Sequence, residues 1–250
     1  MADGGPKAEQ EIKVEYRIQC GGNAHKYVLY LDKYTGRMLN PVPTDPPAWT
    51  HLNVHQCSNC PLSNAENAHC PLSLQLAQVV SDWGHVFSYA EVRYEVITAE
   101  HHFSGSTSAQ KILSALLGLV MATSECPHMH FLRPLARFHL PLSSPEETAF
   151  RAVSTYLLGR YIAGVESRAE NDFEGLIKRY EAVQTVNKCM AKRVADSSGK
   201  DAAINAVVLL DLLAHMVPYF ARETLESLRP LFQLGPVLPV ELPERRVSQG

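Results

Sequence analysis

Apolar and polar residues alternate along two stretches near the start of the chain. Residues 12–18 and 26–32 place every second side chain on an apolar face, which is the pattern of a half-buried strand. The intervening residues 21–23, Gly-Gly-Asn, accept the backbone conformations of a tight turn. We therefore predict an antiparallel hairpin. A third alternating stretch, residues 90–102, predicts a strand that pairs with it.

Apolar residues recur at helical spacing through most of the remaining chain. Helices are predicted over residues 72–83, 109–124, 144–163, 173–194 and 201–228. Ser144 is suited to cap the third of these, and Ser197-Ser-Gly199 separates the last two. The predicted fold class is α+β, with a small N-terminal antiparallel β-sheet and one helix followed by a mainly α-helical bundle.

Proline-rich segments mark the limits of these regions. Residues 41–49 contain four prolines and form a linker that leads into a cysteine-rich stretch, since proline removes a backbone donor and restricts the residue before it. Residues 1–106 are predicted to be a β-rich region with a cysteine knuckle, and residues 107–233 a helical bundle. Residues 234–250 carry three prolines and are predicted to be an extended or disordered tail.

Four cysteines have the pattern of a metal site. Cys57 and Cys60 stand at the Cys-x2-Cys spacing that lets a tight turn aim two thiolates at one ion, and Cys70 follows nearby. Cys126 could complete a tetrahedron, with His128 as the alternate ligand. Proline follows Cys60, Cys70 and Cys126, and no other cysteine.

Four sulfur ligands suit zinc or an iron–sulfur cluster, because thiolates are soft donors. Zinc is the first hypothesis. Proline after a ligating cysteine is also found at iron–sulfur clusters, although the spacing differs from that of a bacterial ferredoxin. A third interpretation is a set of buried thiols without metal. Cys20 and Cys189 lack such neighbours in the sequence and are predicted to be packing residues.

A second group of polar residues lies among apolar neighbours. Arg133 and Arg137 are four residues apart, Pro134 fits a helical first turn between them, and His139 follows closely. Asp211 lies in a helix predicted to be apolar on nearly all sides, where a carboxylate must be paired or protonated. Two interpretations stay open: a buried bridge from Asp211 to one of the arginines, or an arginine pair that binds an anionic ligand.

Composition narrows the classes of function. The chain has 250 residues, 46% of them hydrophobic, and a net charge of −3 without a basic cluster, so binding to nucleic acid is not expected. The start lacks the pattern of a signal peptide, and the longest apolar run is too short to cross a bilayer. We therefore expect a cytoplasmic protein without membrane insertion. Catalytic motifs such as His-Glu-x-x-His and Gly-x-Ser-x-Gly do not occur, and enzymatic activity is left open.

The cysteine and arginine motifs together resemble those of an uncharacterised bacterial protein family without an assigned activity. The resemblance rests on residues 55–62, 69–72, 121–128 and 131–141. It implies a self-standing bacterial protein and no particular chemistry. The residues themselves favour a metal-stapled binding or regulatory module with an unknown protein or a small anionic ligand as partner. The alternative is an iron–sulfur redox or sensor protein.

Overall fold

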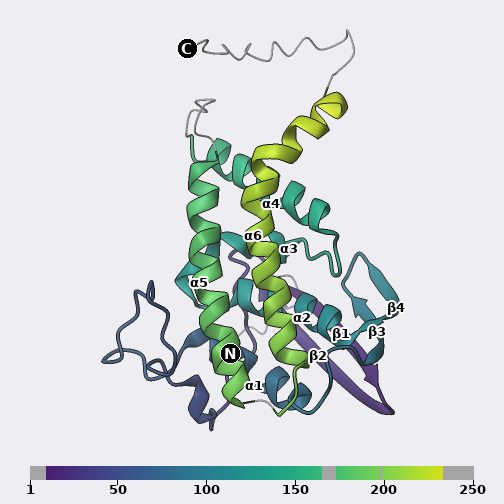
Figure 1. Ribbon diagram of the computed structural model, residues 1–250, viewed down its shortest axis with the longest axis vertical. Helices are drawn as coiled ribbons and strands as arrows, with labels where there is room; N and C mark the ends of the chain where they lie inside the picture. The colour runs from purple at the N-terminus through teal and green to yellow at the C-terminus, as the bar shows by residue number, and fades with distance from the viewer. Residues whose placement is uncertain (1–9, 165–172, 198, 233–250) are drawn as a thin grey trace, which may run out of the picture.

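The computed structural model describes residues 10–164, 173–197 and 199–232. They form an α+β fold in which a four-stranded antiparallel sheet lies beside a group of helices (Figure 1). The strands are β1 (Glu11–Cys20), β2 (Asn23–Asp32), β3 (Glu91–Ile97) and β4 (His102–Ser108), in the order β2-β1-β3-β4. The α+β prediction is confirmed.

The predicted hairpin and its third partner are confirmed. β1 and β2 pair from Glu11 with Asp32 to Cys20 with Asn23, and Gly21 and Gly22 adopt positive φ in the turn. β3 pairs with the other edge of β1. The alternating side chains Val14, Tyr16 and Ile18 are buried.

The prediction missed the edge strand β4. Its sequence, His-Phe-Ser-Gly-Ser-Thr-Ser, contains one large apolar residue, so the alternation that marks a half-buried strand is absent. Pairing with β3 along its whole length holds it in place, and Tyr94 of β3 packs over Gly105. A side chain at position 105 would come within 3.1 Å of the Tyr94 hydroxyl. The small residues of β4 therefore suit an edge strand covered by a tyrosine of its neighbour.

The five predicted helices are confirmed with small shifts at their ends. They are α1 (Pro71–Trp83), α2 (Ala109–Thr123), α4 (Pro145–Ile162), α5 (Glu174–Ser197) and α6 (Ala202–Leu228). A further short helix, α3 (Arg133–Arg137), was not among those predicted. Three short 3-10 helices, η2 (Ala48–Thr50), η3 (Pro127–Leu132) and η4 (Arg229–Phe232), complete the described part. Ser144 caps α4 in a capping box with Glu147. α5 and α6 are the longest helices and run side by side (Figure 1).

One cluster of buried side chains joins the sheet to the helices. It includes Ile18 and Val96 of the sheet, Leu116 of α2, Val186 of α5 and Val207 of α6. The sheet extends to Ser108, just beyond the boundary predicted after residue 106. The tail predicted over residues 234–250 lies outside the described residues. Since the β-rich region and the helical bundle contribute to the same core, a change in either is expected to affect the stability of both.

Helix α6 is unusually apolar for its exposure. By length and composition, Ala202–Ala221 could cross a membrane, and 28% of that window is buried inside the protein. Within the described residues it is one such helix, or one of two candidate spans if the bent pair Ala109–Thr123 and Pro127–Arg137 is counted as a single span. Leu212 and Tyr219 of α6 are among its exposed large side chains.

Candidate functional site: a group of thiols beside helix α5

The cysteine knuckle is a tight turn held against α5. The Cys60 N–H donates to the carbonyl of Cys57 at 3.0 Å, which closes the turn. Within it, the Asn59 amide donates to the carbonyl of Ala182 in α5 at 3.2 Å. His55, just before the knuckle, has a positive φ of 43° and lies 2.6 Å from Asp196 of α5. The knuckle is therefore attached to α5 at two points.

A buried arginine fixes the segment that leads into the knuckle. Arg193 of α5 is 1% exposed and donates to the carbonyls of Trp49, His51 and Leu52 at 3.0, 2.7 and 2.8 Å. A guanidinium carries five N–H donors in a rigid plane, so it can bind several carbonyls of an irregular segment at once. These bonds supply the partners that a buried loop backbone needs.

Cys70 and Cys126 occupy equivalent positions at two helix starts. Each is the N-cap residue and is followed by proline in the first turn, Cys70 at α1 and Cys126 at η3. Their backbone angles nearly coincide, with φ −70° and ψ 119° for Cys70 and φ −71° and ψ 118° for Cys126. Proline favours this placement because it lacks the N–H that a first turn leaves unpaired. At these two positions the Cys-Pro pair puts a thiol at the start of a helix, whereas Cys60-Pro61 lies in a loop.

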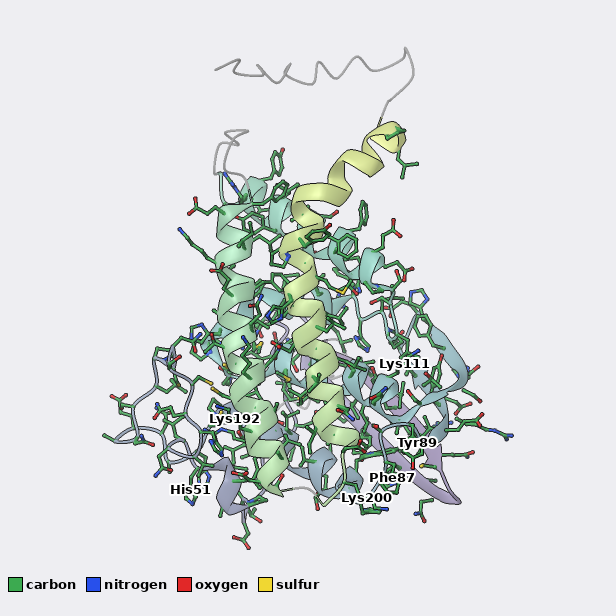
Figure 2. All side chains as sticks on the ribbon, viewed as in Figure 1. His51, Phe87, Tyr89, Lys111, Lys192 and Lys200 are labelled. Carbon is green, nitrogen blue, oxygen red and sulfur yellow. The ribbon has the colours of Figure 1, made fainter. Side chains whose placement is uncertain are left out.

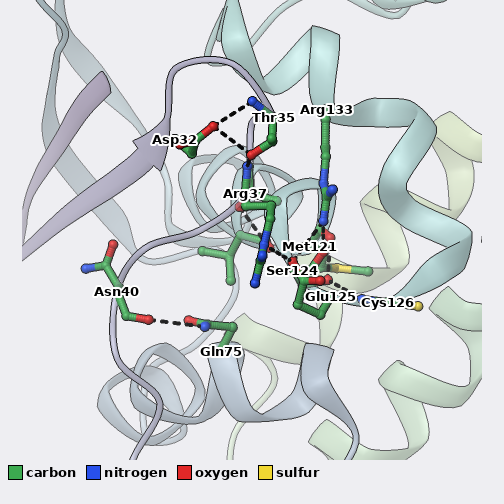
Figure 3. A network of polar contacts seen from close by, with 12 residues as sticks. Asp32, Thr35, Arg37, Asn40, Gln75, Met121, Ser124, Glu125, Cys126 and Arg133 are labelled. Carbon is green, nitrogen blue, oxygen red and sulfur yellow. Dashed lines mark hydrogen bonds and ion pairs between the residues drawn. The ribbon is translucent and has the colours of Figure 1, made fainter. Parts of the chain in front are cut away.

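An ion-pair network fixes the backbone around Cys126 (Figure 3). Glu125 accepts from Arg37 at 2.8 Å and from Arg133 at 2.9 Å. The Cys126 N–H donates to the hydroxyl of Ser124 at 3.3 Å. His128 then binds the carbonyl of Asn59 at 2.7 Å, so the Cys126 segment and the knuckle contact each other directly.

The pKa shifts show that five of the six cysteines lie near one another. Burial raises the pKa of the Cys57 thiol, and Cys189, Cys70 and Cys126 raise it further by their charge. Burial raises the pKa of Cys126 to about 12, with smaller effects from Cys70 and Cys60. Opposing them, the backbone N–H groups of His128 and Met129 lower the pKa of Cys126. At neutral pH and without a cation, Cys57 and Cys126 are thiols.

All six cysteines are free and half-buried. Within the described parts of the chain, no group of three or more His, Cys, Asp or Glu side chains stands in an arrangement that could hold a metal ion. The five thiols therefore lie near one another without forming a ligand set. Binding an ion would require their side chains to change rotamer and draw together. The donors themselves are soft sulfurs, which fits zinc or an iron–sulfur cluster.

Cys189 was not predicted to lie with the other thiols. It was predicted to be a packing residue, and it lies beside Cys57, close enough for a hydrogen bond between the two sulfurs to affect the pKa of Cys57. Cys189 is far from the knuckle in the sequence and has no proline after it, so neither spacing nor context links it to the other four. The only sequence signal for its place in the thiol group is spacing. Cys189 comes four residues before Arg193, so the two side chains lie on the same face of α5.

The predicted bridge from Asp211 to an arginine is wrong. Arg133 pairs with Glu125, and Arg137 lies over the Phe138 ring, 5.3 Å from its centre. Asp211 instead lies 3.6 Å from His215, and 23% of its side chain is exposed. The physical reason is that α6 is exposed along one side, so the Asp211 carboxylate is partly exposed, while its Oδ1 is buried without a hydrogen-bond partner within the described residues. The prediction took the apolar composition of α6 as evidence of burial on all sides.

His139 contacts different residues from those that Arg133 and Arg137 contact. Its Nε2 is 2.5 Å from the Tyr16 hydroxyl, which joins the segment after α3 to the sheet. Burial, with a smaller effect from Arg151, lowers the pKa of His139 to about 4. His139 is therefore neutral at neutral pH, and it cannot act as a third cation beside the arginines.

These observations define a class: an α+β protein in which thiols from a knuckle, two helix starts and a long helix lie near one another. The chain belongs to the family described as a domain of unknown function, DUF6901, whose family model matches residues 12–233. No curated protein and no solved structure matches the chain.

Proposed function

We propose that this protein is a metal-binding module of the cytoplasm in which one zinc ion links Cys57, Cys60, Cys70 and Cys126, with His128 as the alternate ligand. The observation that carries the proposal is the nearness of thiols that the sequence places far apart, all of them free. Buried thiols at one place cannot all ionise without a cation, because each thiolate raises the pKa of the next. A divalent ion offsets that charge.

The role of the ion in this proposal is structural. Four sulfurs around zinc leave no open position for substrate, so the site would tie segments together and would not carry out hydrolysis. The segments concerned are the knuckle, the start of α1 and the start of η3, all of which contact α5 or one another. The tied fold would then act as a binding or regulatory module for a protein or a small anionic ligand, without a role for nucleic acid or membrane.

An iron–sulfur cluster is the second candidate. The observation that favours it is the pair of backbone N–H groups, of His128 and Met129, that lower the pKa of Cys126. Hydrogen bonds to ligand sulfurs are one means by which proteins tune the reduction potential of such clusters. This candidate would make the protein an electron carrier or a redox sensor.

Metal analysis of the purified full-length chain tests both candidates. Zinc at one ion per chain in colourless protein supports the first, and iron with sulfide in coloured, anaerobically purified protein supports the second. Single Cys→Ser variants at positions 57, 60, 70 and 126 should each lose the metal. Cys20→Ser is the matched control and should keep it, because Cys20 ends β1 outside the thiol group. Metal-free wild-type protein from cells supplied with zinc and iron would rule out both.

A further inference from the structure

A large cavity lies on the other side of α5 from the thiols. It has a volume of about 650 Å³, is partly open to solvent, and is lined by α2, α5, α6 and the segment from η3 to α4. Its walls are mainly leucine, methionine, alanine and valine side chains, among them Leu119, Leu135, Leu213 and Met216. A cavity of this size and composition is typical of a site for a small organic molecule.

One wall of the cavity holds a buried amide without partners. Asn187 of α5 is 1% exposed, and within the described residues neither its Nδ2 nor its Oδ1 has a hydrogen-bond partner. A buried amide in this state destabilises the fold, since it has lost its bonds to water without replacing them. An oxygen atom on a bound molecule would restore them.

The charged groups of the cavity are all basic. Lys111 of α2 and Arg151 of α4 line it, and no Asp or Glu is found among its described lining residues. Lys111 is exposed at the first turn of α2 (Figure 2). Arg151 donates to the backbone carbonyls of Leu135 and Phe138, and no ion pair joins it to a carboxylate within the described residues. Glu147, one turn earlier on α4, is the carboxylate that raises the pKa of Arg151, but it does not line the cavity. A half-buried guanidinium therefore faces the cavity without a carboxylate there and favours an anion.

We propose that this cavity binds a carboxylic acid with an apolar body of lipid size. The carboxylate would pair with Arg151 and Lys111, the apolar body would lie along the leucines of α2 and α6, and a hydroxyl or carbonyl oxygen on that body would bond to Asn187. The charge of the lining selects the acid group, the walls select the apolar body, and the amide selects the oxygen. This site goes beyond the proposed metal function and does not depend on it.

The test measures binding of decanoate and of the uncharged 1-decanol to the full-length protein by calorimetry. Decanoate should bind at one site, and decanol at least tenfold more weakly, which corresponds to about 1.4 kcal/mol. Arg151→Gln and Lys111→Gln should each weaken decanoate about tenfold and leave decanol unchanged. Lys192→Gln, on the exposed side of α5 (Figure 2), is the charge-matched control and should change neither. Lys111→Gln decides the outcome if Arg151→Gln fails to fold, because Lys111 is exposed.

The amide is tested separately with decanoates that carry one hydroxyl at successive positions. At least one of them should bind more tightly than decanoate to the wild-type protein, and Asn187→Leu should abolish that preference while still binding decanoate. No binding of decanoate up to about 1 mM, or equal binding of acid and alcohol, would overturn the proposal. A hydroxyl preference that persists in Asn187→Leu would overturn the assignment of the amide.

Discussion

The two sides of α5 differ in how their buried polar groups are paired. On the side of the thiols, Arg193 binds three backbone carbonyls and the Asn59 Nδ2 binds another, and the Asn59 Oδ1 is the one buried polar atom of these two side chains without a partner within the described residues. About 200° around the helix from Cys189, Asn187 faces the cavity with neither polar atom bonded. Paired groups hold a structure together, whereas an unpaired one lowers its stability. We infer that the thiol side is built for stability and the cavity side for binding.

The largest expected effect comes from breaking the paired side. Arg193→Ala should lower the free energy of unfolding by about 3–5 kcal/mol, because it empties a buried site and leaves three carbonyls, that of buried Leu52 among them, without their donor. For a chain of this size that is a fall in melting temperature of roughly 6–20 °C. The matched control is Lys192→Ala, whose exposed side chain should contribute within about 0.5 kcal/mol. Equal effects of the two variants in chemical denaturation would contradict the role of Arg193.

Cys57→Ser should come next, with a loss of about 3 kcal/mol in the free energy of unfolding. If an ion links residues 57 and 126, it closes a long loop, and a cross-link of that kind stabilises by about 3–5 kcal/mol in the chain-entropy account. Cys20→Ser should have a much smaller effect, since Cys20 lies outside the thiol group. Chemical denaturation of both variants gives the comparison. Similar losses would indicate that the thiols act only through packing.

The buried imidazole predicts a pH dependence. The pKa of His139 is about 4 in the folded protein and near 6.5 in an unfolded chain, so the unfolded state binds the proton more readily. The contribution to stability is complete above pH 6.5 and decreases by up to about 3 kcal/mol as the pH falls from 6.5 to 4. Denaturation of the wild type and of His139→Gln across this range measures it. The difference between their unfolding free energies should shrink on acidification, and a constant difference would show that His139 titrates normally.

A smaller effect of opposite sign is expected on the cavity side. Asn187→Leu should raise the free energy of unfolding of the ligand-free protein by about 1–2 kcal/mol, because it replaces an unpaired buried amide by an apolar side chain of similar size. Asn205→Leu is the contrasting variant. Asn205 donates to Asp201 at 3.0 Å, so the same change should destabilise there. If both variants destabilise in a thermal melt, Asn187 is not unpaired in solution and the contrast between the two sides is lost.

The smallest effect is expected at Asp211. Because its carboxylate is partly exposed and lies 3.6 Å from His215, Asp211→Ala should lower the free energy of unfolding by no more than about 0.5 kcal/mol. A buried bridge to an arginine would instead lose about 3–5 kcal/mol on the same change. Thermal unfolding separates the two values readily. A large loss would restore the buried bridge that the apolar sequence of α6 first indicated.

Most of the fold was predictable from local patterns in the sequence. The alternation in residues 12–18 and 26–32 and the capping serine at position 144 act through nearest neighbours, so they are visible in the sequence. β4 could not be predicted because its pairing with β3, not its own composition, makes it a strand.

The candidate site was only partly predictable for a similar reason. The Cys-x2-Cys spacing and the Cys-Pro pairs mark Cys57, Cys60, Cys70 and Cys126 locally, whereas Cys189 joins them through the packing of α5 against the knuckle. The cavity was even less predictable from the sequence. Asn187 and Asn205 are both amides on apolar helix faces, and only their neighbours in space show that one is paired and the other is not.

The link between metal and fold is tested most directly by removing the metal from the wild-type protein and from Cys57→Ser and comparing the melting temperatures. If one ion ties the knuckle to the start of η3, complete chelation lowers the melting temperature of the wild type by roughly 6–12 °C, and leaves that of Cys57→Ser unchanged. An unchanged wild-type melting temperature after complete removal would contradict a structural metal. Equal falls in both proteins would contradict the assignment of Cys57 as a ligand.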